Sequence, residues 1–344
     1  MNKQIKRPTR NDVAAYAGVS VATVSYVVNN GPRTVSEETR QRVLDAIKVL
    51  GYRPHAIARS LKTGNTLTIG LLVQSLIPTF IARLVNAVED SLAKCGYGLI
   101  LASTHEDSDR ERHMLQVLAD QSIDGLLYIP TTCSNGDIVM RLIEQGLPVV
   151  FMDRYIAGIP ADAVMTDNVN ASKQAVEFLI QQGCQKIVCL SFSTEASSAL
   201  ERIEGYRQAI EEHGIGYDKQ NVLLIRYAKG ESVGPALLAY INTFGMPDGI
   251  FCTTDSFVFE TMKILRQSSI KVPDQIRLVG GFDRAEWSSL LDPPIPFIMQ
   301  DFELIAQRAV EFLMERIDGK EYAPRTELIS ADFDWLTPII LPRA

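Results

Sequence analysis

The chain opens with short segments in which apolar positions recur at helical spacing. Residues 9–12 fit a capping box and predict a first helix that ends near Ala17, before a turn at Gly18. A second helix is predicted over residues 21–29, with Ser20 as its cap.

A third helix is predicted from Ser36 to the stop signal Gly51. Its apolar stripe is Val43, Leu44, Ile47 and Leu50. Two short helices joined by a tight turn and packed against a third predict a helix-turn-helix head, whose second helix enters the major groove of DNA. The alternative is a three-helix module that packs in the same way and binds nothing.

Residues 53–64 form a basic segment after the head. Pro54 suits the first turn of a helix and Gly64 its exit, but a helix of about nine residues is too short to be stable alone in water. We therefore expect it to fold only against a second copy of itself or in a DNA groove. Leu61 has two interpretations: it wedges between base steps in the minor groove, or it contacts the body of the protein.

From Leu67 onward, short apolar runs alternate with segments of helical period. The runs predict strands over residues 68–73, 98–102, 125–129, 149–152, 186–190, 222–225, 249–252 and 277–280. Helices are predicted between them over residues 81–94, 110–120, 171–182, 199–213 and 256–267. This alternation predicts parallel sheets with helices on both faces, so the fold class is an all-α head followed by an α/β body.

The predicted strands are too many for one mononucleotide-binding unit, so we expect two parallel-sheet subdomains. We place their boundary near residues 162–167, and we expect segments 296–300 and 303–317 to cross back and complete the first subdomain or the interface. The expected organisation is a helix-turn-helix domain at 1–52, a hinge at 53–66, and an α/β body at 67–344, with subdomains at about 67–163 and 164–296 and a crossover at 297–344.

The 344 residues are 46 % hydrophobic and 22 % charged, which excludes wholesale disorder and a coiled-coil fibre. The five cysteines are odd in number and form no Cys-x-x-Cys pair, so they indicate buried thiols of a reducing compartment and neither a disulfide framework nor a metal site. No apolar run approaches the roughly 18 residues needed to cross a bilayer. We therefore expect a cytoplasmic protein.

The formal net charge of −7 conceals an asymmetry. Residues 1–66 carry eleven Lys and Arg against four Asp and Glu, whereas the remainder carries 23 against 37. A head of net charge +7 on a body of −14 indicates a polyanionic partner for the head, or an imbalance that only aids solubility.

Several motifs in this head occur together and in order. They are Asp12-Val13-Ala14, Ala17-Gly18-Val19-Ser20, Ala22-Thr23-Val24-Ser25, Val35-Ser36, Thr39-Arg40, Gly51-Tyr52-Arg53-Pro54 and Ala58-Arg59-Ser60-Leu61. Together they make residues 8–64 resemble the DNA-binding head and hinge of the lactose-repressor/galactose-repressor (LacI/GalR) family of bacterial transcription regulators. The rest of the chain, through Leu336, resembles the effector domain of that family.

The resemblance implies roles for single positions. It implies that Val21, Ala22 and Tyr26 read bases in the major groove and that the phosphate contacts are Thr9, Ser20, Thr23, Ser25 and Asn29. Arg33 follows the recognition helix. Ala58, Leu61 and Lys62 belong to the hinge, where Leu61 is the lever that opens the central base step. Tyr26 departs from the family pattern, which has arginine there. A tyrosine replaces bidentate guanine recognition with one hydroxyl and an apolar edge for a thymine methyl group.

The body resembles a periplasmic-binding-protein-like pair of subdomains around a cleft. Ligands of open parallel sheets bind beyond the carboxyl ends of the strands, and a cleft between subdomains is their natural site. The expected effector-binding residues are Gln74, Phe80, Asp153, Arg154, Phe192, Arg202, Thr254, Asp255, Asp283, Trp287 and Gln300, with Asp167 and Asn168 at the subdomain boundary. Carboxylates, an arginine and aromatic faces suit a polyhydroxylated ligand.

Arg202 and Asp283 match recurrent effector contacts of the family, and Gln300 lies in a stretch that resembles one where a glutamine is near the sugar. Plainer interpretations remain for four residues. In these interpretations, Asp283 caps a turn, Asp255 is a helix N-cap, Trp287 belongs to the core and Arg202 is a surface helix residue. His105, in a predicted loop before Glu106 and Asp107, and His113, among charges on a predicted helix, are interpreted as solvated residues.

No Gly-x-x-x-x-Gly-Lys phosphate loop, His-Glu-x-x-His or Gly-x-Ser-x-Gly motif occurs, so we expect no enzyme, cofactor or metal. The prediction is a homodimeric, sequence-specific DNA-binding repressor of a sugar-utilisation operon, controlled by a small carbohydrate-like effector in the cleft. Three alternatives stay open: a global catabolite regulator that answers to a phosphorylated carrier protein, a solute-binding protein, and a sugar-acting enzyme.

Overall fold

The computed structural model describes residues 8–28, 35–52, 65–76, 79–193, 195–226, 231–282, 288, 290–292 and 294–334. The chain divides into two compact units, Met1–Thr66 and Leu67–Ala344. In the part of the chain that the structure describes, no helix is both long and apolar enough to cross a bilayer.

The described residues of the first unit form the helices α1 (Arg10–Ala17), α2 (Val21–Val28) and α3 (Glu37–Leu50). Residues from all three make a small apolar core, namely Val13, Ala14, Ala17, Val24, Val27, Val43, Ala46 and Tyr52. The predicted stripe on α3 was wrong at Leu44, which is 44 % exposed, because Ala46 takes the inward position beside Val43.

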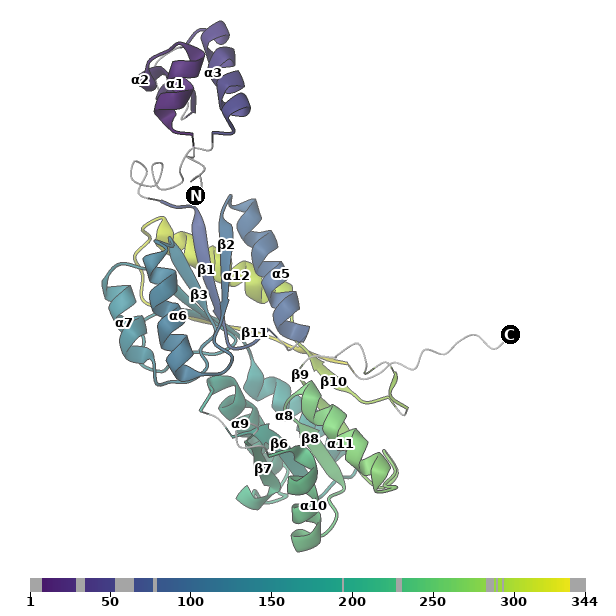
Figure 1. Ribbon diagram of the computed structural model, residues 1–344. Helices are drawn as coiled ribbons and strands as arrows, with labels where there is room; N and C mark the ends of the chain where they lie inside the picture. The colour runs from purple at the N-terminus through teal and green to yellow at the C-terminus, as the bar shows by residue number, and fades with distance from the viewer. Residues whose placement is uncertain are drawn as a thin grey trace. The chain divides into compact units, whose positions relative to one another are not determined.

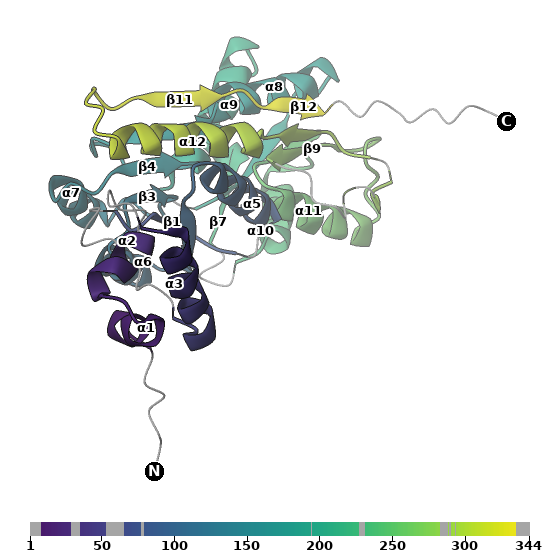
Figure 2. The same cartoon turned by 90° about the horizontal axis from the view of Figure 1, so that it is seen from above.

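The first sheet of the second unit is wholly parallel, with strand order β11-β5-β4-β3-β1-β2. Its strands are β1 (Thr68–Val73), β2 (Gly98–Ser103), β3 (Gly125–Tyr128), β4 (Val149–Met152), β5 (Asp162–Thr166) and β11 (Thr326–Ile329). Helices α5 (Thr79–Lys94) and α12 (Phe302–Ile317) pack side by side on one face, and α6 (Ser108–Asp120) and α7 (Gly136–Glu144) pack on the other (Figures 1 and 2).

The second sheet has the order β12-β10-β9-β8-β6-β7 and is parallel except for β12. Its strands are β6 (Ile187–Phe192), β7 (Val222–Ile225), β8 (Gly249–Cys252), β9 (Arg277–Phe282), β10 (Phe297–Met299) and β12 (Asp332–Asp334), and the short helix η1 (Lys219–Asn221) precedes β7. Helices α8 (Asn168–Gln181) and α9 (Ser197–Glu212) cover one face, and α10 (Val233–Phe244) and α11 (Asp255–Gln267) cover the other.

The chain passes between the two sheets three times, after β5, after β10 and after β11. Two expectations about this exchange were wrong. Residues 164–166 belong to the first sheet, as the end of β5, and residues 297–299 form β10 of the second sheet. Helix α12 does pack on the first sheet, as expected. We name the part built on the first sheet lobe 1 and the part built on the second sheet lobe 2; the predicted fold class is confirmed.

Candidate functional sites

Helix α2 of the head has one inward and one outward face. Val24 and Val27 are buried in the core, whereas Val21 and Ala22 are exposed at the start of the helix. The hydroxyl of Ser20 accepts a 3.1 Å hydrogen bond from the backbone N–H of Thr23 and so caps α2. Small side chains on an exposed, capped helix N-terminus let the backbone come close to a polyanion.

The other head residues expected to contact DNA fall into two groups. Thr23, Ser25 and Tyr26 are half-buried on α2, and Thr9 is exposed and caps α1 through reciprocal hydrogen bonds with Asp12. Asn29, Arg33, Ala58, Leu61 and Lys62 lie outside the described residues. The turn between α1 and α2 rests on Gly18, whose φ of 62° is left-handed, and the Arg42 guanidinium of α3 donates to the Ala17 carbonyl at 2.5 Å.

In the second unit, a cleft brings together side chains from both lobes. Nine of the eleven residues expected to bind an effector line it: Gln74, Phe80, Asp153, Arg154, Phe192, Arg202, Thr254, Asp255 and Gln300. The other two, Asp283 and Trp287, lie outside the described residues. Six residues that sequence reasoning had not selected also line the cleft, namely Glu106, Ser198, Ala199, Thr253, Ser256 and Phe282.

Glu106 is the most informative of the omissions. It follows β2, and the rule that ligands bind beyond strand ends would have found it. The sequence analysis mentions Glu106 only as a neighbour of His105, whereas in the structure its exposed side chain lines the cleft. Phe282 and Thr253 follow the same rule, since they lie at the carboxyl ends of β9 and β8.

Arg202 projects from α9 and is held by polar and aromatic contacts. Its Nε donates to Oδ1 of Asn168 at 3.0 Å, and its Nη1 donates to the carbonyl of Thr253 at 3.0 Å. The guanidinium lies 3.6 Å from the ring centroid of Phe282, and the residue is only 9 % exposed. The interpretation of Arg202 as a surface residue was therefore wrong.

Two glutamines line the floor of the cleft. Gln300 is 5 % exposed, and its Oε1 accepts a 2.6 Å hydrogen bond from the Thr166 hydroxyl. Gln74 is 2 % exposed, and its Oε1 has no hydrogen-bond partner among the described residues. A buried acceptor without a partner is costly unless a ligand or water supplies a donor.

Asp255 is the first residue of α11, and the N-cap position belongs to Thr254. Its carboxylate accepts a 2.8 Å hydrogen bond from the Ser256 N–H, and burial raises the pKa of the Asp255 carboxyl. The interpretation of Asp255 as the N-cap residue was therefore wrong.

The cleft encloses about 90 Å³. Ligand pockets usually offer about 300–1,000 Å³, so a sugar-sized molecule needs the lobes to separate. No group of three or more His, Cys, Asp or Glu side chains in the described ranges is arranged to hold a metal ion.

Comparisons with known proteins agree with this arrangement. Residues 9–55 match the family model of bacterial regulatory proteins of the lacI family, and residues 66–335 match the model of periplasmic binding proteins and sugar binding domain of LacI family. The HTH-type transcriptional repressor PurR of Vibrio campbellii is 34 % identical over 320 residues, which cover 92 % of this chain and 94 % of that protein. The same repressor of Photobacterium profundum is 33 % identical over 317 residues, with the same coverage.

Two solved structures are similar over 95 % of this chain and 98 % of their own. One is the lac repressor dimer bound to operator and the anti-inducer ONPF, with a TM-score of 0.81 and 25 % identity. The other is the complex of the transcriptional regulator CelR with cellobiose, with a TM-score of 0.70 and 28 % identity.

Proposed function

This chain belongs to the LacI family of bacterial regulatory proteins, and we propose that it represses a sugar-utilisation operon under the control of a small carbohydrate-like effector. It is a DNA-binding transcriptional repressor with an effector-binding domain, and it is not an enzyme. The observation that carries the proposal is the cleft between the two lobes. Nine of the side chains that the sequence analysis expected to bind a polyhydroxylated ligand line it.

The head supplies the DNA contacts in this proposal. Val21, Ala22 and Tyr26 read base edges, while the hydroxyls of Ser20 and Thr23 contact phosphates at the start of α2. The surplus of seven positive charges over residues 1–66 adds a sequence-independent attraction that weakens as salt rises.

The cleft supplies the effector contacts. Carboxylates and amides at Asp153, Asp255 and Gln300 hydrogen-bond to hydroxyl groups, and the rings of Phe80 and Phe192 cover apolar faces of a pyranose or furanose. A complex of the relative CelR contains cellobiose, which supports a carbohydrate as the ligand class.

Control of DNA affinity follows from the small cleft volume. An effector that fits only when the lobes separate shifts the population toward the separated form, which changes the positions of the chain segments that enter lobe 1. A coupling of about 1–3 kcal/mol is typical for such systems and alters operator affinity about 5- to 150-fold.

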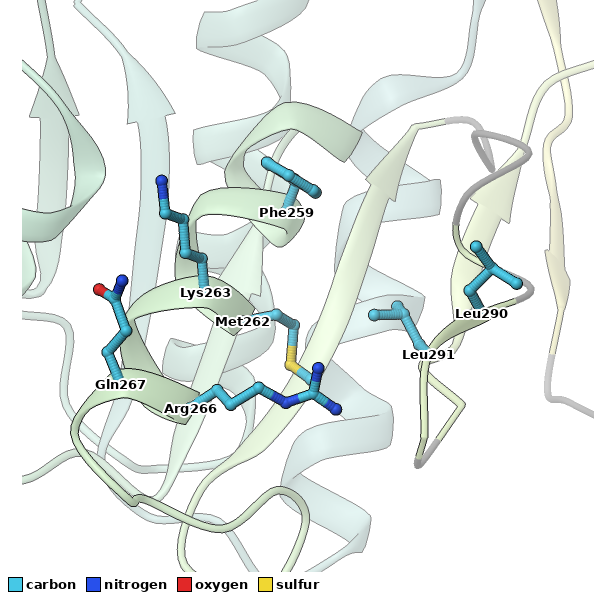
Figure 3. A pocket seen from close by; sticks show the side chains of 7 residues that line it. All are labelled: Phe259, Met262, Lys263, Arg266, Gln267, Leu290 and Leu291. Carbon is cyan, nitrogen blue, oxygen red and sulfur yellow. The ribbon is translucent and has the colours of Figure 1, made fainter.

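The effector domain also presents a surface suited to a second copy of the chain. A hollow of about 530 Å³ lies between α11 and Leu290 and Leu291 (Figure 3). Phe259, Met262, Leu290 and Leu291 give it apolar walls, and Lys263, Arg266 and Gln267 of α11 also line it. Phe259 is 53 % exposed and Leu290 84 % exposed, and apolar side chains gathered in this way mark association surfaces. The lac repressor structure with which the chain aligns is a dimer, so the proposed occupant is the partner protomer.

The dimer proposal is tested by Phe259→Glu. We expect this variant to sediment as a monomer, because the glutamate places a charge in an apolar contact. Phe244→Glu, which changes a phenylalanine of 45 % exposure on α10, is the matched control and is expected to remain dimeric. A Phe259→Glu variant that sediments like the wild type would contradict the assignment of this surface.

The whole proposal is tested by binding the full chain to DNA from its own promoter region while a panel of sugars is added. A sugar that changes the operator affinity supports the proposal. Sugars that never change this affinity, combined with a response to a phosphorylated carrier protein, favour a catabolite regulator instead. The variant Leu61→Ala tests the expected lever and should abolish tight operator binding while the fold persists.

A further inference from the structure

Asp153 lines the cleft from lobe 1, and its backbone is strained. It directly follows β4 with a φ of 59°, which non-glycine residues rarely adopt. The backbone N–H of Arg154 donates to the Met152 carbonyl at 2.5 Å and closes a tight three-residue turn around Asp153. Strain of this kind persists where the surrounding structure enforces it, and it is concentrated at ligand sites.

The carboxylate of Asp153 has little compensation for its burial. Its side chain is 10 % exposed, and its carboxylate forms an ion pair with Nε of Arg154 at 3.6 Å. No hydrogen bond from the described residues reaches the carboxylate oxygens, and the same Nε has no hydrogen-bond partner there either. A buried, charged acceptor without donors is expensive, so this arrangement awaits a ligand that supplies them.

The charges around the cleft favour one class of ligand. Among the described residues that line it, there are three carboxylates, at Glu106, Asp153 and Asp255, against two guanidinium groups, at Arg154 and Arg202. The Nε and Nη1 atoms of Arg202 already donate to protein acceptors, and its guanidinium group lies over an aromatic ring.

Glu201 adds a further carboxylate near the residues that line the cleft. Glu201 accepts a 2.8 Å hydrogen bond from Nδ2 of Asn168, and burial together with the nearby Asp153 raises the pKa of Glu201. Among the described lining residues, carboxylates outnumber guanidinium groups. The buried Oε1 of Gln74 has no partner, and the Asp153 carboxylate has only its ion pair with Arg154, so both can accept hydrogen bonds from a ligand.

We infer that the cleft takes an uncharged or cationic polyhydroxylated ligand and rejects the phosphorylated and carboxylated forms of the same molecule, with Asp153 as the specificity-determining residue. The inference rests on the proposed effector function of the cleft. An anionic group next to Asp153 meets like charge in a water-poor site, whereas a hydroxyl or ammonium group donates to it.

The first test uses thermal unfolding of the full chain with matched pairs of probes. The pairs are D-glucose with D-glucose 6-phosphate, D-fructose with D-fructose 6-phosphate, D-ribose with D-ribose 5-phosphate, and D-glucosamine with D-gluconate. Stabilisation by the uncharged or cationic member, with at least tenfold weaker binding of the anionic member, is the expected result. An anionic probe that stabilises the protein as well as or better than its partner overturns the inference.

The second test needs no ligand and asks whether the Asp153 carboxylate, on which the inference depends, is uncompensated in the free protein. Asp153→Asn removes the charge but keeps a residue that tolerates positive φ, so the free variant is expected to melt about 2 °C or more above the wild type. Asp274→Asn, at an exposed position, is the control and should leave the melting temperature unchanged. A lower melting temperature for Asp153→Asn means that its carboxylate stabilises the fold, which overturns the inference.

Failure of the proposed function has a different signature. A protein that does not bind promoter DNA, or whose DNA affinity no sugar alters, contradicts the repressor proposal. The ranking of the paired probes and the Asp153→Asn comparison still decide the charge preference of the cleft in that case.

Discussion

The Thr166 hydroxyl donates a 2.6 Å hydrogen bond to Oε1 of Gln300, 134 positions later in the chain. Thr166 ends β5 and Gln300 follows β10, so the bond ties together two of the three segments that connect the lobes. The third segment is joined by the backbone N–H of Asp167, which donates to the Ile329 carbonyl at 2.8 Å. Because Gln300 also lines the cleft, one side chain belongs to both the ligand site and the lobe connection.

Replacing this hydroxyl tests how much the connection contributes. Thr166→Val leaves the buried Oε1 of Gln300 without its donor, and we expect the free energy of unfolding to fall by about 1–3 kcal/mol. Urea unfolding of the full chain measures the change. Thr243→Val, which removes an exposed hydroxyl bonded to its own helix, should change stability by less than about 0.5 kcal/mol. Equal effects of the two substitutions would contradict a special role for Thr166.

A buried ion pair fixes the start of β5 at Asp162. The Asp162 carboxylate is fully buried and accepts from Nε and Nη2 of Arg316 at 2.8 and 3.0 Å and from the backbone N–H of Arg325 at 2.9 Å. Asp162→Ala leaves a half-buried guanidinium without its counter-charge, so a loss of about 3–5 kcal/mol in unfolding free energy is expected.

The matched comparison for Asp162→Ala is Glu327→Ala. It breaks the more exposed pair with Arg308 and should cost at most about 1 kcal/mol. A cost for Asp162→Ala as small as that for Glu327→Ala would show that burial does not strengthen the first pair.

Helices α8 and α9 are packed closely at a glycine. A Cβ on Gly205 would lie 2.2 Å from the Val169 carbonyl oxygen and 2.8 Å from Cβ of Ser172. Gly205→Ala must therefore push the helices apart, at a cost of about 1–3 kcal/mol, and it should weaken ligand binding because Asn168 of α8 holds Arg202 of α9.

Thermal unfolding and ligand titration measure both effects of Gly205→Ala. Gly98→Ala is a suitable control, since its Cβ would meet only the Leu67 carbonyl oxygen, at 3.8 Å. A Gly205→Ala variant that behaves like Gly98→Ala would refute the close contact.

Acid lability is expected from two paired carboxylates. Hydrogen bonds from Arg207 and Gln208 lower the pKa of Glu204 to about 2, and hydrogen bonds from Lys320, Arg325 and Tyr322 lower that of Glu315 to about 2. Because both folded-state pKa values lie below the ordinary 4.5, their contribution is complete above about pH 4.5 and is lost as the pH falls toward 2.

The doubly substituted variant Glu204→Gln, Glu315→Gln should therefore show a shallower fall of the urea midpoint between pH 4.5 and 2 than the wild type. The side chains of Glu204 and Glu315 are 38 % and 31 % exposed, so solvent screens these charges and the difference is expected to be small. Identical slopes in the two proteins would contradict the contribution of these hydrogen bonds.

Local pattern predicted most of the fold because long apolar runs and capping residues act over short stretches. The strands 68–73, 149–152, 222–225 and 249–252 were predicted with the bounds that the structure has. Strand β5 was mistaken for a boundary because its stability depends on remote partners, above all the Arg316 pair with Asp162. The short strands β10, β11 and β12 likewise depend on neighbours far along the chain, which no local pattern contains.

The lining residues of the cleft could be predicted where they follow the carboxyl ends of strands. Eight of the nine predicted lining residues were found in this way. Arg202, Ser198 and Ala199 reach the cleft from α9, whose packing the sequence does not specify. The strain at Asp153 and the unpartnered oxygen of Gln74 emerge only from three-dimensional coordinates.

The central claim is that the head binds a specific DNA sequence and that the cleft controls this binding. The most direct measurement is the affinity of the full chain for a fluorescently labelled duplex from its own promoter region, compared with a scrambled duplex of equal length, at several salt concentrations and with each sugar of the panel. We predict promoter binding that is at least 10³-fold tighter, falls steeply with salt, and changes at least fivefold with one of the sugars. Equal affinity for the two duplexes, or promoter binding that none of the sugars alters, would contradict the account.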